Sequence, residues 1–253
     1  MAHALKVASS VLTSSLALWR GTGRSGAARR QPEMLPVLYE FEGCPYCRMV
    51  RSALSELDLD VMIQPCPARG QRFRPVAKAL GGKAQFPFLH DPNTGARLYE
   101  SKDIVDYLAK TYEGRAKSNA GVARRISLGA SMLASGSRGL RGMRARPSKA
   151  PAQPLELYSF ESSPYSRLVR EVLCELELPY TLRNTAKARN TDMGPPVVRD
   201  RWFKAPKDTS RNRAALLERT GRVQVPYLID PNTGTEMYES AAIIDYLEKT
   251  YGA

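Results

Sequence analysis

The sequence has few residues of the kinds that build disulfide frameworks or hold metals. Its 253 residues include two histidines and four cysteines, at Cys44, Cys47, Cys66 and Cys174. These cysteines are too few and too unevenly spaced for a disulfide framework, which favours a reducing compartment. The chain offers too few further ligands beside one cysteine pair for structural zinc, so we expect no metal. No apolar run approaches the roughly 20 residues that a membrane-spanning helix needs.

Acidic residues are absent from two long stretches, residues 1–32 and 115–153. The net charge of +13 arises in residues 1–34 and 115–153, because residues 35–114 and 154–253 each hold equal numbers of acidic and basic side chains. A nucleic-acid-binding domain carries its basic patch on a folded face. We therefore expect two electrically neutral domains and no nucleic-acid partner.

The first 34 residues have the composition of a targeting segment. They are rich in Ala, Ser, Arg and Gly, and a short apolar stripe from Val11 to Trp19 precedes four arginines. Low acid content with Arg and Ser is typical of an organelle transit peptide. We predict a chloroplast transit peptide, with the mitochondrion as the alternative destination. The other interpretation is a disordered tail that targets nothing.

The rest of the chain contains an internal repeat. Residues 35–59 align with 154–178 and share 13 of 25 positions, and residues 84–113 align with 223–252 and share 18 of 30. The second copy carries extra residues in its middle, near 185–206. Two long copies indicate a pair of duplicated globular domains rather than a solenoid.

Each copy predicts the same order of elements. The first copy reads as a strand at 36–41, a helix through 58, a strand at 61–63, a helix ended by Gly81-Gly82, a hairpin of strands at 86–90 and 97–100, and a helix capped by Ser101. A βαβ unit followed by a helix, a hairpin and a last helix gives a four-stranded mixed sheet flanked by helices. We predict α/β domains at 35–114 and 154–253. The basic linker between them, 115–153, reads equally as a helix on an anionic membrane, a helix docked between the domains, or a solvated tether.

The residues with redox chemistry lie where the first predicted strand meets the first helix. Cys44-Pro45-Tyr46-Cys47 opens that helix, so the thiol of Cys44 faces unpaired N–H groups and the positive end of the helix dipole. Both lower the pKa of a thiol. Cys47 lies one turn further on the same face, where it can resolve a mixed disulfide formed at Cys44.

Two further features recur in both copies. Pro87 and Pro226 open the third strand, either as ordinary trans prolines or after a cis bond. Glu100-Ser101 and Glu239-Ser240 lie at a strand-to-helix turn, where a helix start suits a carboxylate and the Glu suits an ammonium group. Together they suit an α-amino-acid headgroup such as the γ-glutamyl end of glutathione.

These motifs resemble two related families. The strand–Cys44-Pro45-Tyr46-Cys47–helix is similar to the dithiol site of glutaredoxins. Phe86-Pro87, the Asp91–Gly95 turn and Glu100-Ser101 resemble the N-terminal, glutathione-binding domain of glutathione transferases, and the tandem is most similar to plastid proteins of plants and algae. The resemblance implies two thioredoxin-like domains. In the first it implies a cis-Pro87, a glutathione site of Tyr46, Phe86, Pro87, Glu100 and Ser101, and Cys44 and Cys47 as the reacting thiols.

The second copy keeps the binding positions but not the thiols. Ser163 and Ser166 replace the cysteines, and a serine hydroxyl cannot exchange disulfides. The second-domain candidates for glutathione are Ser163, Val225, Pro226, Glu239 and Ser240.

We favour an enzyme, a glutathione-dependent thiol–disulfide oxidoreductase. Its partners would be glutathione and disulfide-containing or glutathionylated client proteins. The alternatives are a non-catalytic assembly factor on a membrane complex, reached through the linker, and a minimal glutathione transferase. We expect Cys66 to be a redox-sensitive bystander and Cys174 a buried residue of the core.

Overall fold

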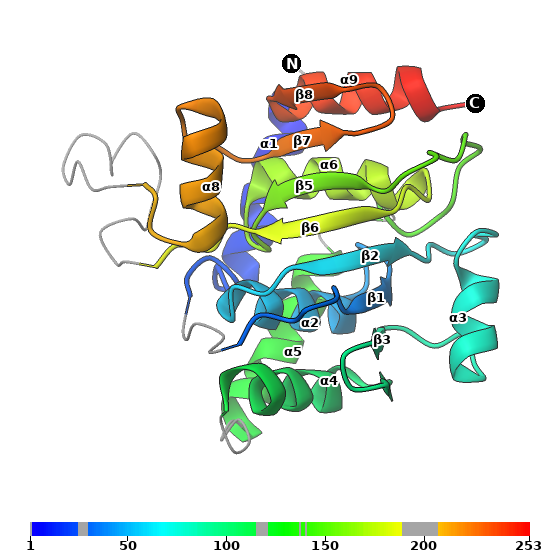
Figure 1. Ribbon diagram of the computed structural model, residues 1–253, viewed down its shortest axis with the longest axis vertical. Coiled ribbons are helices and arrows are strands. Elements are labelled where there is room, and N and C mark those ends of the chain that lie inside the picture. Colours follow the sequence, from blue (N-terminus) through cyan, green and yellow to red (C-terminus); the bar gives the residue numbers. More distant parts are fainter. Residues whose placement is uncertain (1, 25–29, 115–120, 137, 140, 189–206) are drawn as a thin grey trace.

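The computed structural model describes residues 2–24, 30–114, 121–136, 138–139, 141–188 and 207–253 (Figure 1). The elements of the first domain are β1 (Val37–Glu40), α2 (Pro45–Glu56), β2 (Val61–Pro65), α3 (Arg74–Gly81), β3 (Phe88–Asp91), β4 (Ala96–Leu98), α4 (Ser101–Leu108) and the π-helical turn η1 (Ala109–Glu113). The second domain contains β5 (Leu155–Ser159), α6 (Pro164–Glu175), β6 (Tyr180–Asn184), α8 (Arg211–Thr220), β7 (Tyr227–Asp230), β8 (Thr235–Tyr238) and α9 (Ser240–Tyr251). Two further helices precede the domains, α1 (Ala2–Leu16) and α5 (Gly121–Gly136).

The predicted order of elements is confirmed in both copies. Gly82 and Gly221 end α3 and α8 at φ values of +83° and +74°, which a residue without Cβ adopts without strain. One local expectation is wrong, because Ser101 does not cap α4. Glu100 is the N-cap residue, it makes no side-chain capping bond, and Ser101 is the first helical residue. Of the expected insert, residues 189–206 lie outside the described residues.

The two domains share one sheet. Its strand order is β4-β3-β1-β2-β6-β5-β7-β8, which places the β2–β6 pair at the centre (Figure 1). β2 and β6 are antiparallel, with Met62 opposite Thr181, and these two residues are equivalent in the repeat. The expectation of two separate four-stranded sheets is therefore corrected. Each domain supplies four strands, and equivalent edge strands join them about a local two-fold axis, which removes both inner edges.

One apolar cluster spans both domains, and two smaller clusters include residues of α3 and α8. Leu38 and Ile63 of the first domain belong to the same buried cluster as Leu157 and Leu182 of the second. Burial of apolar side chains on both sides of the β2–β6 pair makes the halves one folding body.

A buried network of ions reinforces the joint between the domains. Arg51 of α2 donates to Glu161 of the second domain at 2.8 Å and also pairs with Glu40 and Glu42. The equivalent Arg170 of α6 donates to Glu42 at 3.0 and 3.1 Å and lies 3.2 Å from Glu161. Both arginines are almost fully buried. Arg51 of the first domain thus pairs with Glu161 of the second, and Arg170 of the second pairs with Glu42 of the first.

The repeated Asp-Pro-Asn-Thr-Gly turn holds the start of its own domain. Asp91 accepts hydrogen bonds from Tyr107 at 2.7 Å and from Tyr112, and from the Asn93 side chain at 2.7 Å. Asn93 in turn bonds the backbone N–H and C=O of Met34. Asp230 and Asn232 make the same bonds with Tyr246, Tyr251 and the backbone of Gln153. The motif is therefore structural in both copies.

The segments expected outside the fold are packed onto it. α1 contacts α6 and α5, and α5 contacts α2, so that the helices follow one another on one side of the sheet (Figure 1). The expectation of a disordered tail at residues 1–34 is therefore wrong for residues 2–24, although targeting stays a prediction. For the linker, the described residues of α5 match the docked-helix interpretation. No helix in the described part of the chain has the length and apolarity needed to cross a bilayer.

Candidate functional site

Cys44 lies at the start of α2, as the sequence predicts. It is the N-cap residue, with extended backbone, and Pro45 is the first helical residue. Its sulfur accepts a hydrogen bond from the backbone N–H of Cys47 at 3.2 Å. The thiol therefore takes the position that a serine or aspartate side chain holds in an ordinary N-cap.

The two thiols have opposite acidities. Hydrogen bonding from the Cys47 side chain, and then from the backbone of Cys47 and Tyr46, lowers the pKa of Cys44, although burial opposes the shift. Burial and the neighbouring Cys44 raise the pKa of Cys47 well above its ordinary value. Cys44 is thus the more acidic of the two thiols.

The proline that opens the third strand is brought to this helix start. The Phe86–Pro87 peptide bond is cis, as the resemblance implies. The Phe86 ring lies edge-on to the Phe41 ring, with centroids 6.4 Å apart, and Phe41 O accepts the N–H of Cys44 at 3.0 Å. Phe41 therefore links the cis-proline strand to the thiol loop.

The Glu–Ser corner has a strained backbone in both copies. Glu100 has a φ of +60° and Glu239 a φ of +71°, a region that non-glycine residues rarely adopt. Both glutamates are exposed, and each accepts a hydrogen bond from a glutamine, Gln85 at 2.5 Å and Gln224 at 2.6 Å. A strained backbone at the same exposed acidic corner of both domains favours a functional role for that corner over a packing role.

The thiol end of the first site is covered. Cys44 is 3% exposed and Cys47 is fully buried. Ser131 of α5 donates to Pro45 O at 2.8 Å. Met143 lies so close to Gly43 that a Cβ on this glycine would meet its side chain at 2.4 Å. An exposed thiol was a requirement of the predicted redox site, and this conformation does not meet it.

The second domain has the same arrangement without thiols. Ser163 is the N-cap of α6, accepts from Ser166 N at 3.3 Å and is 2% exposed. The Val225–Pro226 bond is cis. Ser10 of α1 donates to Pro164 O at 2.8 Å, and His3 at the start of α1 lies 3.2 Å from the Ser240 hydroxyl. α1 therefore reaches from the helix start to the Glu–Ser corner and occupies the space beside both.

The comparison with protein families decides the relationship of the two domains. The family described as glutathione S-transferase, N-terminal domain, matches residues 38–116 and 157–253, well over half of the chain. The chain belongs to this family. Each matched stretch begins within the first strand of one domain and includes its helix start, its cis-proline and its Glu–Ser corner, so both are glutathione S-transferase N-terminal domains.

Other comparisons add little to this. A solved glutathione transferase of Bombyx mori, BmGSTD1, is 24% identical, with a TM-score of 0.30. The match covers 39% of this chain and 45% of that enzyme, so the chain spans less than half of its length. No curated protein matches the chain.

Sequence reasoning assigned α1 to a targeting segment and left α5 as one of several interpretations of the linker, so the covering of the two glutathione S-transferase N-terminal domains was not predicted. α1 and α5 are themselves copies, because Ser10-x-Leu12-x-Ser14 recurs as Ser131-x-Leu133-x-Ser135. Arg20-Gly21 likewise recurs as Arg141-Gly142. The backbone after each helix pairs with its domain in the same way, Gly23 with Lys187 and Arg144 with Ala68. The repeat therefore begins before residue 35. The recurring Ser-x-Leu-x-Ser spacing was the sequence signal for it.

The remaining cysteines lie inside the structure. Cys174 is buried as expected, but at the joint between the domains. Its sulfur accepts from Glu42 N at 3.4 Å and lies 3.3 Å from Gly142 O. Cys66 is fully buried, and burial raises the pKa of its thiol. A buried thiol of this kind does not fit the expected redox-sensitive bystander.

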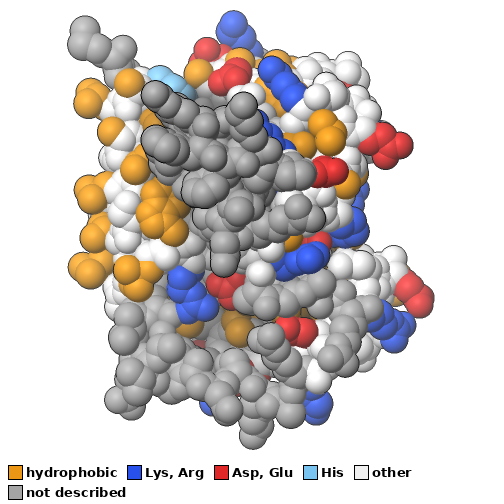
Figure 2. Space-filling view, turned by 90° about the vertical axis from the view of Figure 1, so that its left-hand side faces the viewer, with side chains coloured by type: hydrophobic (Ala, Val, Ile, Leu, Met, Phe, Trp, Pro, Cys, Tyr) orange, Lys and Arg blue, Asp and Glu red, His pale blue; other side chains and the backbone are white. Residues whose placement is uncertain are grey.

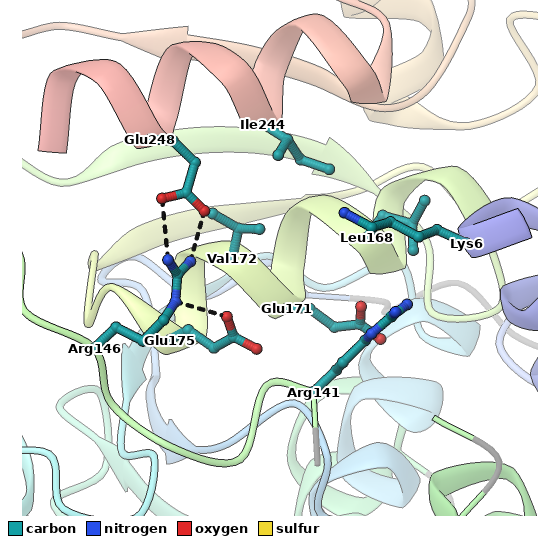
Figure 3. Close-up of a pocket in the computed structure, with 9 residues that line it drawn as sticks. All are labelled: Lys6, Arg141, Arg146, Leu168, Glu171, Val172, Glu175, Ile244 and Glu248. Atoms are coloured by element: carbon teal, nitrogen blue, oxygen red, sulfur yellow. Dashed lines mark hydrogen bonds and ion pairs between the residues drawn. The ribbon is translucent and has the colours of Figure 1, made fainter. Parts of the chain in front are cut away.

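A pocket of about 250 Å³ lies between α6, α9 and the segment after α5, lined by charged residues such as Lys6, Arg141 and Arg146 (Figure 3). None of the predicted site residues lines it. In Figure 3, Arg146 bonds Glu175 and Glu248. Within the described ranges, no three His, Cys, Asp or Glu side chains are grouped so as to hold a metal ion.

Proposed function

We propose that the chain is a glutathione-dependent thiol–disulfide oxidoreductase that reacts at Cys44. The observation that carries the proposal is the N-cap sulfur, which accepts the Cys47 N–H at 3.2 Å, together with the opposite shifts of the two thiol pKa values. A lowered pKa at Cys44 supplies the attacking thiolate, and a raised pKa at Cys47 delays its attack until Cys44 is engaged.

The reaction uses two exchanges. The Cys44 thiolate attacks one sulfur of a client disulfide, and the other client sulfur leaves and takes up a proton. Cys47 then loses its proton and attacks the Cys44 sulfur, which releases the second client thiol and leaves a Cys44–Cys47 disulfide. Two glutathione molecules return this disulfide to two thiols and leave as glutathione disulfide. Glu100 and Ser101 would hold the γ-glutamyl end of glutathione, and Phe86 and Pro87 its peptide.

The proposal requires that the cover over Cys44 lifts. Ser131 and Met143 block the approach of a disulfide to a thiol that is 3% exposed. The attacking sulfur must lie within reach of the client sulfur, so turnover depends on the fraction of molecules whose cover is open.

The test is reduction of β-hydroxyethyl disulfide by glutathione, with the wild type, Cys44→Ser and Cys47→Ser. We expect Cys44→Ser to have no activity and Cys47→Ser to keep only exchange with glutathionylated substrates. Cys174→Ser is the matched control, because Ser55 holds the equivalent position in the first domain and forms the equivalent bond to Glu161 N. A wild-type rate no higher than that of Cys44→Ser removes the oxidoreductase.

The second candidate is a non-catalytic glutathione-binding assembly factor. It is favoured by the burial of both helix starts, at Cys44 and at Ser163. Such a factor would keep its partner, and its affinity for glutathione, when both Cys44 and Cys47 are changed to serine. A transferase centred on Ser163 is disfavoured, because His3 of α1 lies 3.2 Å from the Ser240 hydroxyl, in the corner where the γ-glutamyl end of glutathione would bind. We expect no conjugation of 1-chloro-2,4-dinitrobenzene.

The chloroplast location is part of the proposal. It is supported by the composition of residues 1–34 alone. A fluorescent protein joined after residue 34 should enter chloroplasts, and its retention in the cytosol would remove this part.

A further inference from the structure

The two covering helices turn their polar sides inward. On α1, Ser10 donates to Pro164 O at 2.8 Å, Ser14 donates to Ser162 O at 2.7 Å, and both hydroxyls are buried. On α5, the buried positions toward α2 are Ser131, Ala134 and Ser135. A surface helix of a globular protein usually buries leucines and exposes hydroxyls. α1 and α5 do the reverse.

Their outward sides are apolar. Leu5, Val11 and Leu12 of α1 are 37–71% exposed, and Met132 and Leu133 of α5 are 45% and 65% exposed. Directly after α1, Leu18 and Trp19 are also exposed. Exposed apolar residues that gather in one place, rather than singly, mark an interaction surface.

The two outward sides form one surface. α1 and α5 contact each other, and Leu12 and Val11 occupy the positions equivalent to Leu133 and Met132 in the repeat. In Figure 2, hydrophobic side chains gather along the left-hand edge of the molecule. This edge corresponds to the far side of Figure 1, where α1 lies. We call Leu5, Val11, Leu12, Met132 and Leu133 the helix-pair face.

The segments that form the helix-pair face carry basic charge only. Residues 1–32 and 115–153 contain no acidic residue, Lys6 and Arg141 are exposed, and Arg20 pairs with Glu56 at 3.6 Å. The nearest acids drawn in Figure 3 are already paired, Glu171 with Arg138 and Glu175 and Glu248 with Arg146. Lys6 and Arg141 line the same pocket without an ion pair in the described structure. Positive charge is therefore left beside the apolar face.

We propose that the helix-pair face docks on an anionic lipid bilayer, with α1 and α5 lying in the plane of the interface. Leucines and a tryptophan enter the boundary between headgroups and acyl chains, while Lys6 and Arg141 contact the headgroup charges. Apolar area and basic charge both contribute to such binding, and anionic lipid complements a surface whose segments hold no acid. This inference is independent of any reaction at Cys44.

The test is flotation of the full chain with vesicles of phosphatidylcholine alone and of equimolar phosphatidylcholine and phosphatidylglycerol. We expect binding to the anionic vesicles that weakens as salt rises and is absent with phosphatidylcholine. The variant Leu12→Ser/Leu133→Ser should bind about tenfold more weakly, since two largely exposed leucines leave the bilayer. The matched control is Val76→Ser/Leu217→Ser, which removes exposed apolar residues from α3 and α8.

A spectroscopic readout reports the exposed segment directly after α1. In Trp202→Phe, Trp19 is the only tryptophan, and its emission should shift to shorter wavelength with anionic vesicles. Equal flotation of the leucine variant and the wild type overturns the proposal. So does a wild type that dimerises by light scattering while the leucine variant is monomeric, because the face is then an interface between copies. Thermal unfolding confirms that each variant is folded.

Discussion

Ser131 donates its hydroxyl to the backbone carbonyl of Pro45, the residue that follows Cys44, at 2.8 Å. Its counterpart Ser10 makes the same bond to Pro164, beside Ser163, at the same distance. α5 and α1 therefore cover the starts of α2 and α6 with the same hydrogen bond. The covered group is a thiol at Cys44 and a hydroxyl at Ser163. This symmetry supplies a control for each experiment on the cover.

Loosening the first cover should expose Cys44. In Ser131→Ala/Met143→Ala the hydroxyl bond to Pro45 and the side chain over Gly43 are both lost. We expect the rate of Cys44 alkylation by iodoacetamide to rise by about fivefold, because the open population grows with the roughly 1 kcal/mol that one hydrogen bond contributes. Mass spectrometry of the Cys44 peptide measures it. Ser10→Ala/Thr22→Ala, at the equivalent positions over Ser163, should leave that rate unchanged, and an equal rise in both would mean general loosening.

The two thiols should react at different pH. Hydrogen bonds lower the pKa of Cys44, and burial raises that of Cys47. In Cys66→Ser/Cys174→Ser, alkylation of Cys44 should rise with pH and level off below the value of about 8.5 usual for a thiol. Cys47 should stay unmodified over the same range. A Cys44 profile that still rises above pH 9 would show a thiol that is not activated.

The ions at the joint should be essential to folding. Arg170→Met leaves Glu42 and Glu161 buried with one arginine fewer. Removing one partner of a buried pair costs about 3–5 kcal/mol. We expect urea unfolding to show a loss of that size. The control is Arg219→Met, which removes an exposed pair with Glu236 and should cost less than about 1 kcal/mol. Similar losses in the two variants would show that the network is not specific.

Acid should weaken the turn that holds each domain start. Burial raises the pKa of Asp230, but bonds from Tyr246, Tyr251 and Asn232 outweigh it, and the pKa lies below its ordinary value. The stability that this carboxylate contributes is therefore present above the unfolded-state pKa of about 3.9 and is lost as the pH falls through the folded-state value. Asp230→Asn should unfold more easily by about 1.5–3 kcal/mol at neutral pH. Its stability should also fall less steeply toward pH 3. Asp245→Asn, at an exposed carboxyl of α9, is the control and should match the wild type at both pH values.

Local chemistry predicted much of the site. Turn residues, apolar spacing and a strand–Cys–Pro–helix transition placed Cys44 at the N-cap, and the structure confirms that position. The sequence did not predict Glu100 as the N-cap residue, because its positive φ is a property of the backbone. The serine that follows it looks like an ordinary N-cap residue. The joining of β2 to β6 was missed because edge-strand pairing depends on residues far apart in sequence.

The cover was missed for a different reason. An amphipathic pattern is normally read with its apolar side facing the core. In α5, Leu133 is exposed and Ser131 is buried, so the apolar side of this helix faces outward and not toward the core. Residues 2–24 were assigned to a targeting segment from their composition, so their packing on the fold was not predicted. Only the match of Ser10 and Ser14 with Ser131 and Ser135 would have predicted it.

Packing of α1 conflicts with its removal as a transit peptide. Arg167 is almost fully buried, and its guanidinium donates to Ser10 O at 2.8 Å and to Ser14 Oγ at 2.9 Å. A chain without residues 2–24 leaves this arginine without these two partners and exposes the side of α6 that contacts α1. We expect that chain to unfold at lower urea concentration than the full chain.

A point variant tests the bonds of Ser10 and Ser14 without shortening the chain. Ser10→Ala/Ser14→Ala removes the two buried hydroxyls and should cost about 1–3 kcal/mol for each partner left unpaired. Ser15→Ala, at an exposed position of α1, should cost almost nothing. If the shortened chain and the full chain unfold at the same urea concentration, α1 is dispensable to the fold and free to act as a cleaved presequence. If the shortened chain is the weaker, a mature protein must keep residues 2–24, and any targeting signal acts without being removed.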